Sequence, residues 1–333
     1  YEEGMLLDVA SGGEMYVALA AGVPPDALTM HGNNKSTAEL REALAEGVRY
    51  LVVDCHDEID RLEVLHAEGL PVPNVVLRIT PGVHAHTHEY IATGQDDSKF
   101  GFNLGNGDAA AAVDRARRSS AVNLVGVHCH IGSNVFAVES FARAAEVMAT
   151  FAAPLDLPEL VLGGGLGVPY VGGEEAPTIS EWGRVLLDAC RSLGVRSKIS
   201  VEPGRSIVAS AAVTVYTVGV VKRIPGVRTY VSVDGGMSDN PRPVLYGSGY
   251  EAFDPRHPHD SRELSARLVG KHCESGDVLI FDAALPSGIA AGDLVATPVT
   301  GAYGHSMASN YNKLTRPPVV FVSDGHARLV VRR

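Results

Sequence analysis

The sequence predicts an α/β protein, with a (β/α)8 barrel followed by a mostly antiparallel β domain. Up to residue 209, short apolar runs alternate with segments of helical spacing. This alternation indicates a parallel sheet, because strands that are covered on both faces read as continuous apolar runs. From residue 210 onward, turn-rich loops join the apolar runs directly, which is typical of a β domain. We therefore predict two domains, at residues 1–209 and 210–333, in a chain long enough to hold both.

The first domain is predicted element by element from these apolar runs and helical spacings. Seven strands are predicted, one fewer than the eight of a closed barrel. We expect the eighth to precede Leu6, and an open, doubly wound sheet is the structural alternative. The predicted strands are 6–11, 28–31, 50–55, 74–80, 124–131, 160–162 and 199–202, and the predicted helices are 13–21, 37–46, 58–66, 109–117, 138–152 and 180–193.

The second domain is predicted to contain only strands and loops. Its apolar runs are short, and Gly, Pro, Asn and Asp separate them. The predicted strands are 213–221, 229–233, 266–272, 278–283, 294–299, 319–322 and 327–331.

Composition excludes several classes of partner. The formal net charge of −11 argues against nucleic acid or an anionic membrane, since both repel an acidic protein. Four cysteines without C-x-x-C pairs or zinc spacing predict free thiols and no metal site. No apolar run approaches the roughly 18 residues of a transmembrane helix, and no signal peptide opens the sequence. We therefore expect a cytoplasmic protein.

Residues 202–205 are a candidate binding motif after the last barrel strand. Glu202 and Arg205 flank the rigid Pro203-Gly204 turn, at the strand end where barrels place their active sites. Opposite charges with free backbone N–H groups suit an anionic ligand that carries nitrogen. A structural ion pair between Glu202 and Arg205 is the alternative interpretation.

Two further strand ends have the chemistry of the same kind of site. His130, Gly132 and Ser133 follow one strand, where an imidazole can stack on a ring and N–H groups can bind an anion. The run Gly163-Gly164-Gly165 follows the next strand and permits a close approach of backbone to a phosphate. It lacks the spacing of a dinucleotide fingerprint. His128 and Cys129 raise the question of a metal, but alternation along a strand directs them to opposite faces.

Three loops of the second domain carry polar and reactive side chains. The first, residues 234–243, ends near Arg242 and Tyr246. The second contains the adjacent thiol and carboxylate of Cys273 and Glu274, and the third runs from residue 301 to 312. Each alone could be a solvated loop, but three in one small domain predict a functional role.

Together these stretches resemble the fold type III pyridoxal-phosphate (PLP) decarboxylases, and among them the branch that acts on diaminopimelate. The resemblance spans almost the whole sequence and implies an alanine-racemase-like barrel, a C-terminal β domain and PLP as cofactor. The matching stretches, in the order of the family, are 31–36, 98–101, 130–133, 163–165, 202–205, 234–237, 273–277 and 309–312.

The resemblance also implies roles for the residues that would bind the cofactor. Glu202 would pair with the pyridine nitrogen, and His130 would stack on the ring. Asp8 matches an aspartate near the lysine that binds PLP covalently. That lysine falls before Tyr1, so we expect it to lie outside the given sequence, on the same strand that the barrel lacks. The phosphate would be bound by Ser133, Gly164, Gly165, Gly204 and Tyr311, with Arg205 nearby.

For the substrate, the resemblance implies decarboxylation of meso-2,6-diaminopimelate to L-lysine, the last step of lysine biosynthesis. Arg205, Arg242 and Tyr246 would bind the distal carboxylate, while Glu274 and Tyr311 would contact the distal end. Cys273 would return a proton to the product, and in this family Cys273 and Glu274 complete the partner's site in a homodimer. Two alternatives stay open: a decarboxylase for ornithine, carboxynorspermidine or a biosynthetic conjugate, and a non-catalytic PLP-binding relative.

Overall fold

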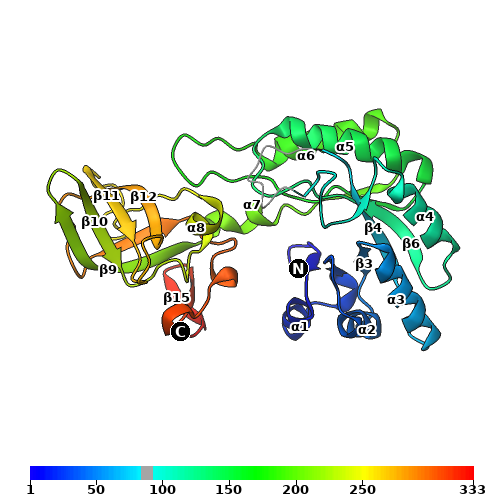
Figure 1. Ribbon diagram of the computed structural model, residues 1–333, viewed down its shortest axis with the longest axis horizontal. Coiled ribbons are helices and arrows are strands. Elements are labelled where there is room, and N and C mark those ends of the chain that lie inside the picture. Colours follow the sequence, from blue (N-terminus) through cyan, green and yellow to red (C-terminus); the bar gives the residue numbers. More distant parts are fainter. Residues whose placement is uncertain (84–92) are drawn as a thin grey trace. The chain divides into compact units, whose positions relative to one another are not determined.

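The computed structural model describes residues 1–83 and 93–333, which form two compact units (Figure 1). The first unit comprises residues 1–167 and 177–203, and the second comprises residues 168–176 and 204–333. The segment 168–176 thus leaves the first unit and packs with the second. Each unit is described by itself.

The first unit is built on a curved parallel sheet with strand order β1-β2-β3-β4-β6-β7-β8, and β5 pairs with β4. All of the pairings are parallel, and the carboxyl ends of the strands therefore lie at one edge. The strands are β1 (Leu7–Val9), β2 (Leu28–Met30), β3 (Tyr50–Val53), β4 (Asn74–Thr80), β5 (Phe102–Asn103), β6 (Asn123–His128), β7 (Glu159–Val161) and β8 (Lys198–Ser200).

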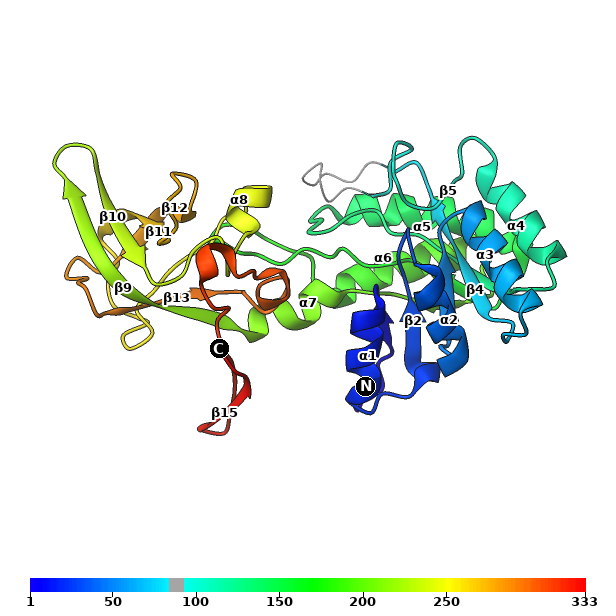
Figure 2. The same cartoon turned by 60° about the horizontal axis from the view of Figure 1, so that its bottom comes forward.

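Helices lie on the outer side of this sheet (Figure 1), and α1 and α2 lie next to β1 and β2 (Figure 2). Two of them begin at capping boxes, in which Ser36 and Thr178 each exchange hydrogen bonds with a glutamate three residues on. The helices are α1 (Gly12–Ala20), α2 (Thr37–Glu46), α3 (His56–Ala67), α4 (Asp108–Arg118), α5 (Val138–Ala152) and α6 (Ile179–Ser192).

The apolar core between sheet and helices fixes the strand ends. Leu51, Leu77, Val127 and Leu160 are fully buried on neighbouring strands, and each side chain of this size contributes about 1.5–3 kcal/mol when buried. One buried ion pair lies beside this core: Lys35 Nζ is 2.8 Å from Glu58 Oε1 and also donates to two backbone carbonyls. It fixes the loop between β2 and α2.

The second unit contains a five-stranded sheet with order β12-β11-β10-β9-β13 and a separate two-stranded hairpin, β14-β15. All of the pairings are antiparallel except that between β10 and β11. Two short helices, α7 (Gly204–Val208) and α8 (Arg242–Tyr246), carry arginines. The strands are β9 (Val213–Ile224), β10 (Arg228–Val233), β11 (Leu264–Val269), β12 (Val278–Leu285), β13 (Leu294–Pro298), β14 (Val319–Ser323) and β15 (His326–Val331).

The fold class agrees with the sequence analysis. The seven parallel strands occur in the expected order, and a mostly antiparallel β unit follows them. The short elements β5, α7 and α8 were not predicted, because two to five residues are too few to show a period. Among the described residues, no helix is both long enough and apolar enough to span a membrane.

Candidate active site

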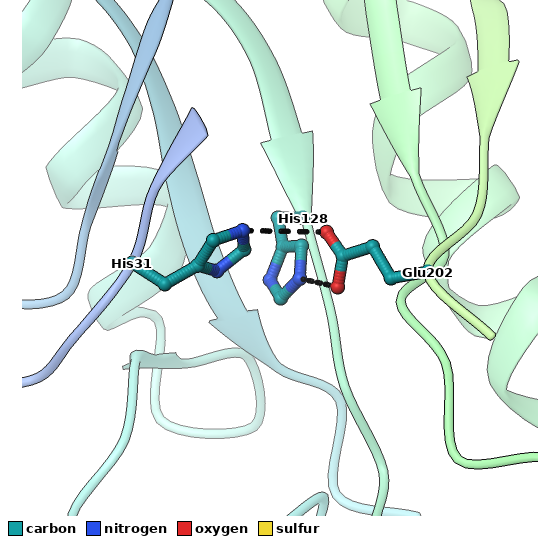
Figure 3. A group of neighbouring side chains, drawn as sticks. All are labelled: His31, His128 and Glu202. Carbon is teal, nitrogen blue, oxygen red and sulfur yellow. Dashed lines mark hydrogen bonds and ion pairs between the residues drawn. The ribbon is translucent and has the colours of Figure 1, made fainter. Parts of the chain in front are cut away.

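The carboxyl ends of the parallel strands bring Glu202 of the first unit against two histidines (Figure 3). His128 ends β6, and its Nε2 lies 3.1 Å from Glu202 Oε2. His31 follows β2, and its Nε2 lies 3.5 Å from Glu202 Oε1 and 3.5 Å from Asp8 Oδ1. Asp8, which was predicted near the cofactor, is therefore connected to Glu202 through His31.

The histidines around Glu202 favour its ionised form. Burial alone would raise the pKa of Glu202, but its interaction and hydrogen bond with His128 and its interactions with His31 and His130 lower it to about 2. Burial lowers the pKa of His128, and it lowers that of His130 to about 4. The charges of the buried Arg78 and Glu202 also attract each other.

The low pKa of Glu202 predicts a stability effect at acid pH. The pKa of Glu202 in the folded state lies below the ordinary 4.5. The ionised side chain therefore makes its full contribution to the free energy of unfolding above about pH 4.5, and this contribution is lost as the pH falls toward 2. We expect Glu202→Gln to lose less free energy of unfolding than the parent over this interval. Chemical denaturation at pH 4.5, 3.5 and 2.5 measures this difference, and parallel curves for parent and variant would contradict it.

The glycine run after β7 makes the closest backbone contacts of the site. A Cβ on Gly164 would lie 1.9 Å from the carbonyl oxygen of Glu202, and one on Gly165 would lie 2.0 Å from that of Gly132. The Gly164 N–H donates to His130 Nδ1 at 3.2 Å. The ends of β6, β7 and β8 therefore meet without side chains between them, and this brings His130, Gly132 and Ser133 to the same edge as Glu202.

In the second unit, Arg205 and Arg242 share the ring of Tyr170. Their guanidinium carbons lie 5.9 and 5.2 Å from its centroid, and both side chains are buried. Arg205 donates to the Tyr170 hydroxyl at 2.6 Å, while Arg242 donates to those of Tyr250 and Ser248 at 3.1 Å. Buried guanidinium groups of this kind can bind an anionic ligand.

Aromatic rings surround this arginine pair. The Arg242 guanidinium lies 5.4 Å from the Tyr246 ring, and that of Arg205 lies 4.7 Å from the Tyr303 ring. Burial raises the pKa of Tyr250 to about 12, so its hydroxyl stays neutral. The sequence analysis selected Arg205, Arg242 and Tyr246, and it included Tyr303 only as part of the loop 301–312. It missed Tyr170 and Tyr250, because nothing local marks an aromatic residue as the neighbour of a distant arginine.

The three polar loops predicted in the β domain converge in the second unit. Asp277 accepts hydrogen bonds from the backbone of Met237 and His272, at 2.7 and 2.8 Å. The His272 ring contacts Ser238 Oγ at 2.8 Å, and Asn312 Nδ2 lies 3.1 Å from its Nδ1. These bonds join the loops that contain residues 234–240, 271–277 and 309–313, which indicates a built site rather than separate solvated loops.

Cys273, Glu274 and Tyr311 lie on two of these loops. Cys273 is an exposed, free thiol. The Tyr311 hydroxyl donates to the Glu274 carboxylate, and this hydrogen bond raises the pKa of Tyr311. Gly204 begins α7, one residue before Arg205, in the same unit.

His31, His128 and Glu202 are also a possible donor set for a metal ion. One ligand atom from each lies within 4.8 Å of the others, and two imidazoles with a carboxylate occur at zinc sites. The positive charge of Arg78, however, acts on this cluster and repels other cations. It repels a divalent metal ion more strongly than an organic ring that carries a single positive charge. The arrangement therefore favours an organic ligand.

The residues of the first unit fit PLP. A partly buried, ionised carboxylate suits a protonated pyridine nitrogen, and the backbone cradle of residues 163–165, in which a Cβ at Gly164 or Gly165 has no space, suits a phosphate. His130 and Ser133 follow β6 at the same edge. Fold and site together define the class of PLP-binding barrel enzymes.

Comparison with known proteins agrees with this class. Residues 1–209 match the family model described as "Pyridoxal-dependent decarboxylase, pyridoxal binding domain". The chain is 47% identical to diaminopimelate decarboxylase of Bacillus subtilis over 347 residues, which cover 100% of this chain and 78% of the relative. It belongs to the pyridoxal-dependent decarboxylases, in the group of the diaminopimelate decarboxylases, and its cofactor is PLP.

Solved structures show the same fold. Diaminopimelate decarboxylase from Helicobacter pylori, complexed with L-lysine, superposes with a TM-score of 0.91 at 33% identity, covering 98% of this chain and 81% of the other. A lysine/ornithine decarboxylase from Vibrio vulnificus has a TM-score of 0.77 at 24% identity, covering 95% of this chain and 80% of the other. This second likeness concerns the fold alone.

Proposed function

We propose that the protein decarboxylates meso-2,6-diaminopimelate at its D-configured centre and releases L-lysine. The observation that carries this proposal is the pair of buried arginines, Arg205 and Arg242, in a decarboxylase of the diaminopimelate group. A substrate with a second carboxylate far from the reacting carbon explains why two guanidinium groups are buried.

In the first unit, the residues would hold the cofactor and balance its charge. Bound PLP supplies an electron-withdrawing ring that accepts the electron pair left when carbon dioxide departs. Glu202 would present an anion to the ring nitrogen, and His130 would stack on the ring. Ser133, Gly164, Gly165, Gly204 and Tyr311 would bind the phosphate. Asp8 would lie near the reactive aldehyde.

In the second unit, the residues would select the substrate and return a proton. Arg205, Arg242 and Tyr246 bind the distal carboxylate, and Glu274 binds the distal ammonium group with Tyr311 beside it. Cys273 gives a proton to the carbon that has lost its carboxylate. The exposure of Cys273 is compatible with action in a second subunit, so we propose a homodimer in which Cys273 and Glu274 complete the partner's site.

The proposed function also assigns a role to each domain and places the protein in the cytoplasm. Residues 1–209 would form the PLP-binding barrel domain, and residues 210–333 would form the C-terminal β domain. The four free cysteines suit the reducing cytoplasm.

The arginine pair predicts a substrate-specific effect. Arg242→Ala is expected to raise KM for meso-diaminopimelate by about 10- to 100-fold, because charged hydrogen bonds contribute about 1.5–3 kcal/mol. Ornithine has no second carboxylate, so any turnover of ornithine should be the same in Arg242→Ala as in the parent. Steady-state kinetics with both substrates, at equal cofactor content, measures this difference.

Arg262→Ala is the matched control, since Arg262 belongs to the same unit and donates to the backbone carbonyl of Ala252 at 3.0 Å. Its KM for meso-diaminopimelate should equal that of the parent. Efficient parent turnover of ornithine, without turnover of meso-diaminopimelate, would contradict the proposed function.

A further inference from the structure

Two histidines contact the two oxygens of one carboxylate, and they differ in their surroundings. Figure 3 shows the side chains of His31 and His128 directed at the two oxygens of Glu202. The histidine rings lie 5.2 Å apart at 67°. These residues come from β6 and the loops after β2 and β8, so the contact depends on the parallel register of the whole sheet.

His128 has the properties of a neutral donor. It is 1% exposed, and burial disfavours its charged form. When the Nε2–H donates to Glu202, the Nδ1 atom must be an acceptor, and this buried atom has no hydrogen-bond partner among the described residues. An unpaired buried acceptor is costly, and an apolar side chain would pack here without that cost. The histidine at this position therefore serves Glu202 rather than packing.

His31 has the properties of a cation between two carboxylates. Its Nε2 is 3.5 Å from both Asp8 and Glu202, at ion-pair distance. Burial opposes its charge, but the contacts with Asp8 and Glu202 prevail and raise the pKa of His31. Among the described residues, the other charged or titratable groups that act on this cluster are Arg78, Asp54, Cys129 and His130.

We propose that His31 and His128 are positioning residues which keep Glu202 ionised and orient it toward the ring nitrogen of bound PLP. His128 fixes one carboxylate oxygen by a hydrogen bond, and His31 supplies a compensating charge that Asp8 stabilises. This inference rests on the proposed role of Glu202 and assigns a function to two residues that do not themselves contact the reacting atoms.

The test is the protonation state of the ring nitrogen in the holoenzyme. The parent and the variants are loaded with 15N-labelled PLP, and the nitrogen chemical shift is recorded by NMR. We expect the chemical shift of a protonated ring nitrogen in the parent and in His128→Gln, because the glutamine amide can still donate a hydrogen bond to Glu202. His128→Leu and His31→Gln should move the resonance toward the unprotonated position and lower kcat by about 10- to 100-fold, as for other orienting contacts.

The matched control is His56→Gln, which removes a histidine 3.0 Å from Asp108 in the same unit. It should change neither the resonance nor kcat. If His128→Leu does not fold, His31→Gln decides the question by itself. A resonance at the parent position in every folded variant that still binds PLP would overturn the inference while leaving the proposed function intact. Failure of the parent to bind PLP would instead refute the proposed function.

Discussion

Replacing Glu202 with glutamine is expected to lower kcat by about 10²- to 10³-fold while PLP stays bound, because preorganised charges contribute effects of this size. Glutamine keeps the shape of the side chain and an acceptor for His128. It removes the negative charge that the histidines and Arg78 surround. A neutral amide cannot balance a protonated ring nitrogen, so the electron-withdrawing power of the cofactor falls.

The control for this substitution is Glu159→Gln, in the same sheet. Glu159 is buried at the start of β7 and accepts a hydrogen bond from the Tyr50 hydroxyl at 2.9 Å. Its loss should reduce stability but leave kcat per folded molecule near the parent value. The measurements are kcat and the cofactor content by visible absorbance. If Glu202→Gln retained the parent kcat at full cofactor content, Glu202 would not be the group that pairs with the ring.

Much of the fold was predictable because its signals are local. Strands such as Tyr50–Val53 are largely apolar on both faces, and the helices that begin after Ser36 and Thr178 carry capping boxes. Glu202 was selected for a similar reason, since a charge that directly follows a buried strand lies at the strand end. Periodicity and strand ends can be recognised from sequence alone.

The contacts within the site were less predictable because they depend on tertiary register. His31 and His128 are far apart in sequence. His31 follows β2 and His128 ends β6, and the strands β3 and β4 lie between β2 and β6 in the sheet. The curvature of the sheet therefore decides whether they reach Glu202. Tyr170 likewise meets Arg205 and Arg242 only because residues 168–176 pack with the second unit.

Adding one methyl group at Gly164 is expected to reduce the free energy of unfolding by about 3 kcal/mol or more and to weaken cofactor binding. The new Cβ would lie 1.9 Å from the carbonyl oxygen of Glu202 and 2.6 Å from its carbonyl carbon. Backbone atoms cannot rotate away as a side chain can. The ends of β7 and β8 must therefore separate, and this displaces both Glu202 and the His130 ring, to which Gly164 donates.

Gly183→Ala is the matched control, since Gly183 lies inside α6 and a Cβ there would meet no atom within 4 Å. It should stabilise the protein by about 0.5–1 kcal/mol, because alanine loses less conformational freedom in a helix. Denaturant unfolding measures both variants. A Gly164→Ala protein as stable as the parent would show that the strand ends can separate freely. Because the backbone of Gly164 does not have a positive φ, alanine is not strained there, and any loss reports the close approach of the strands.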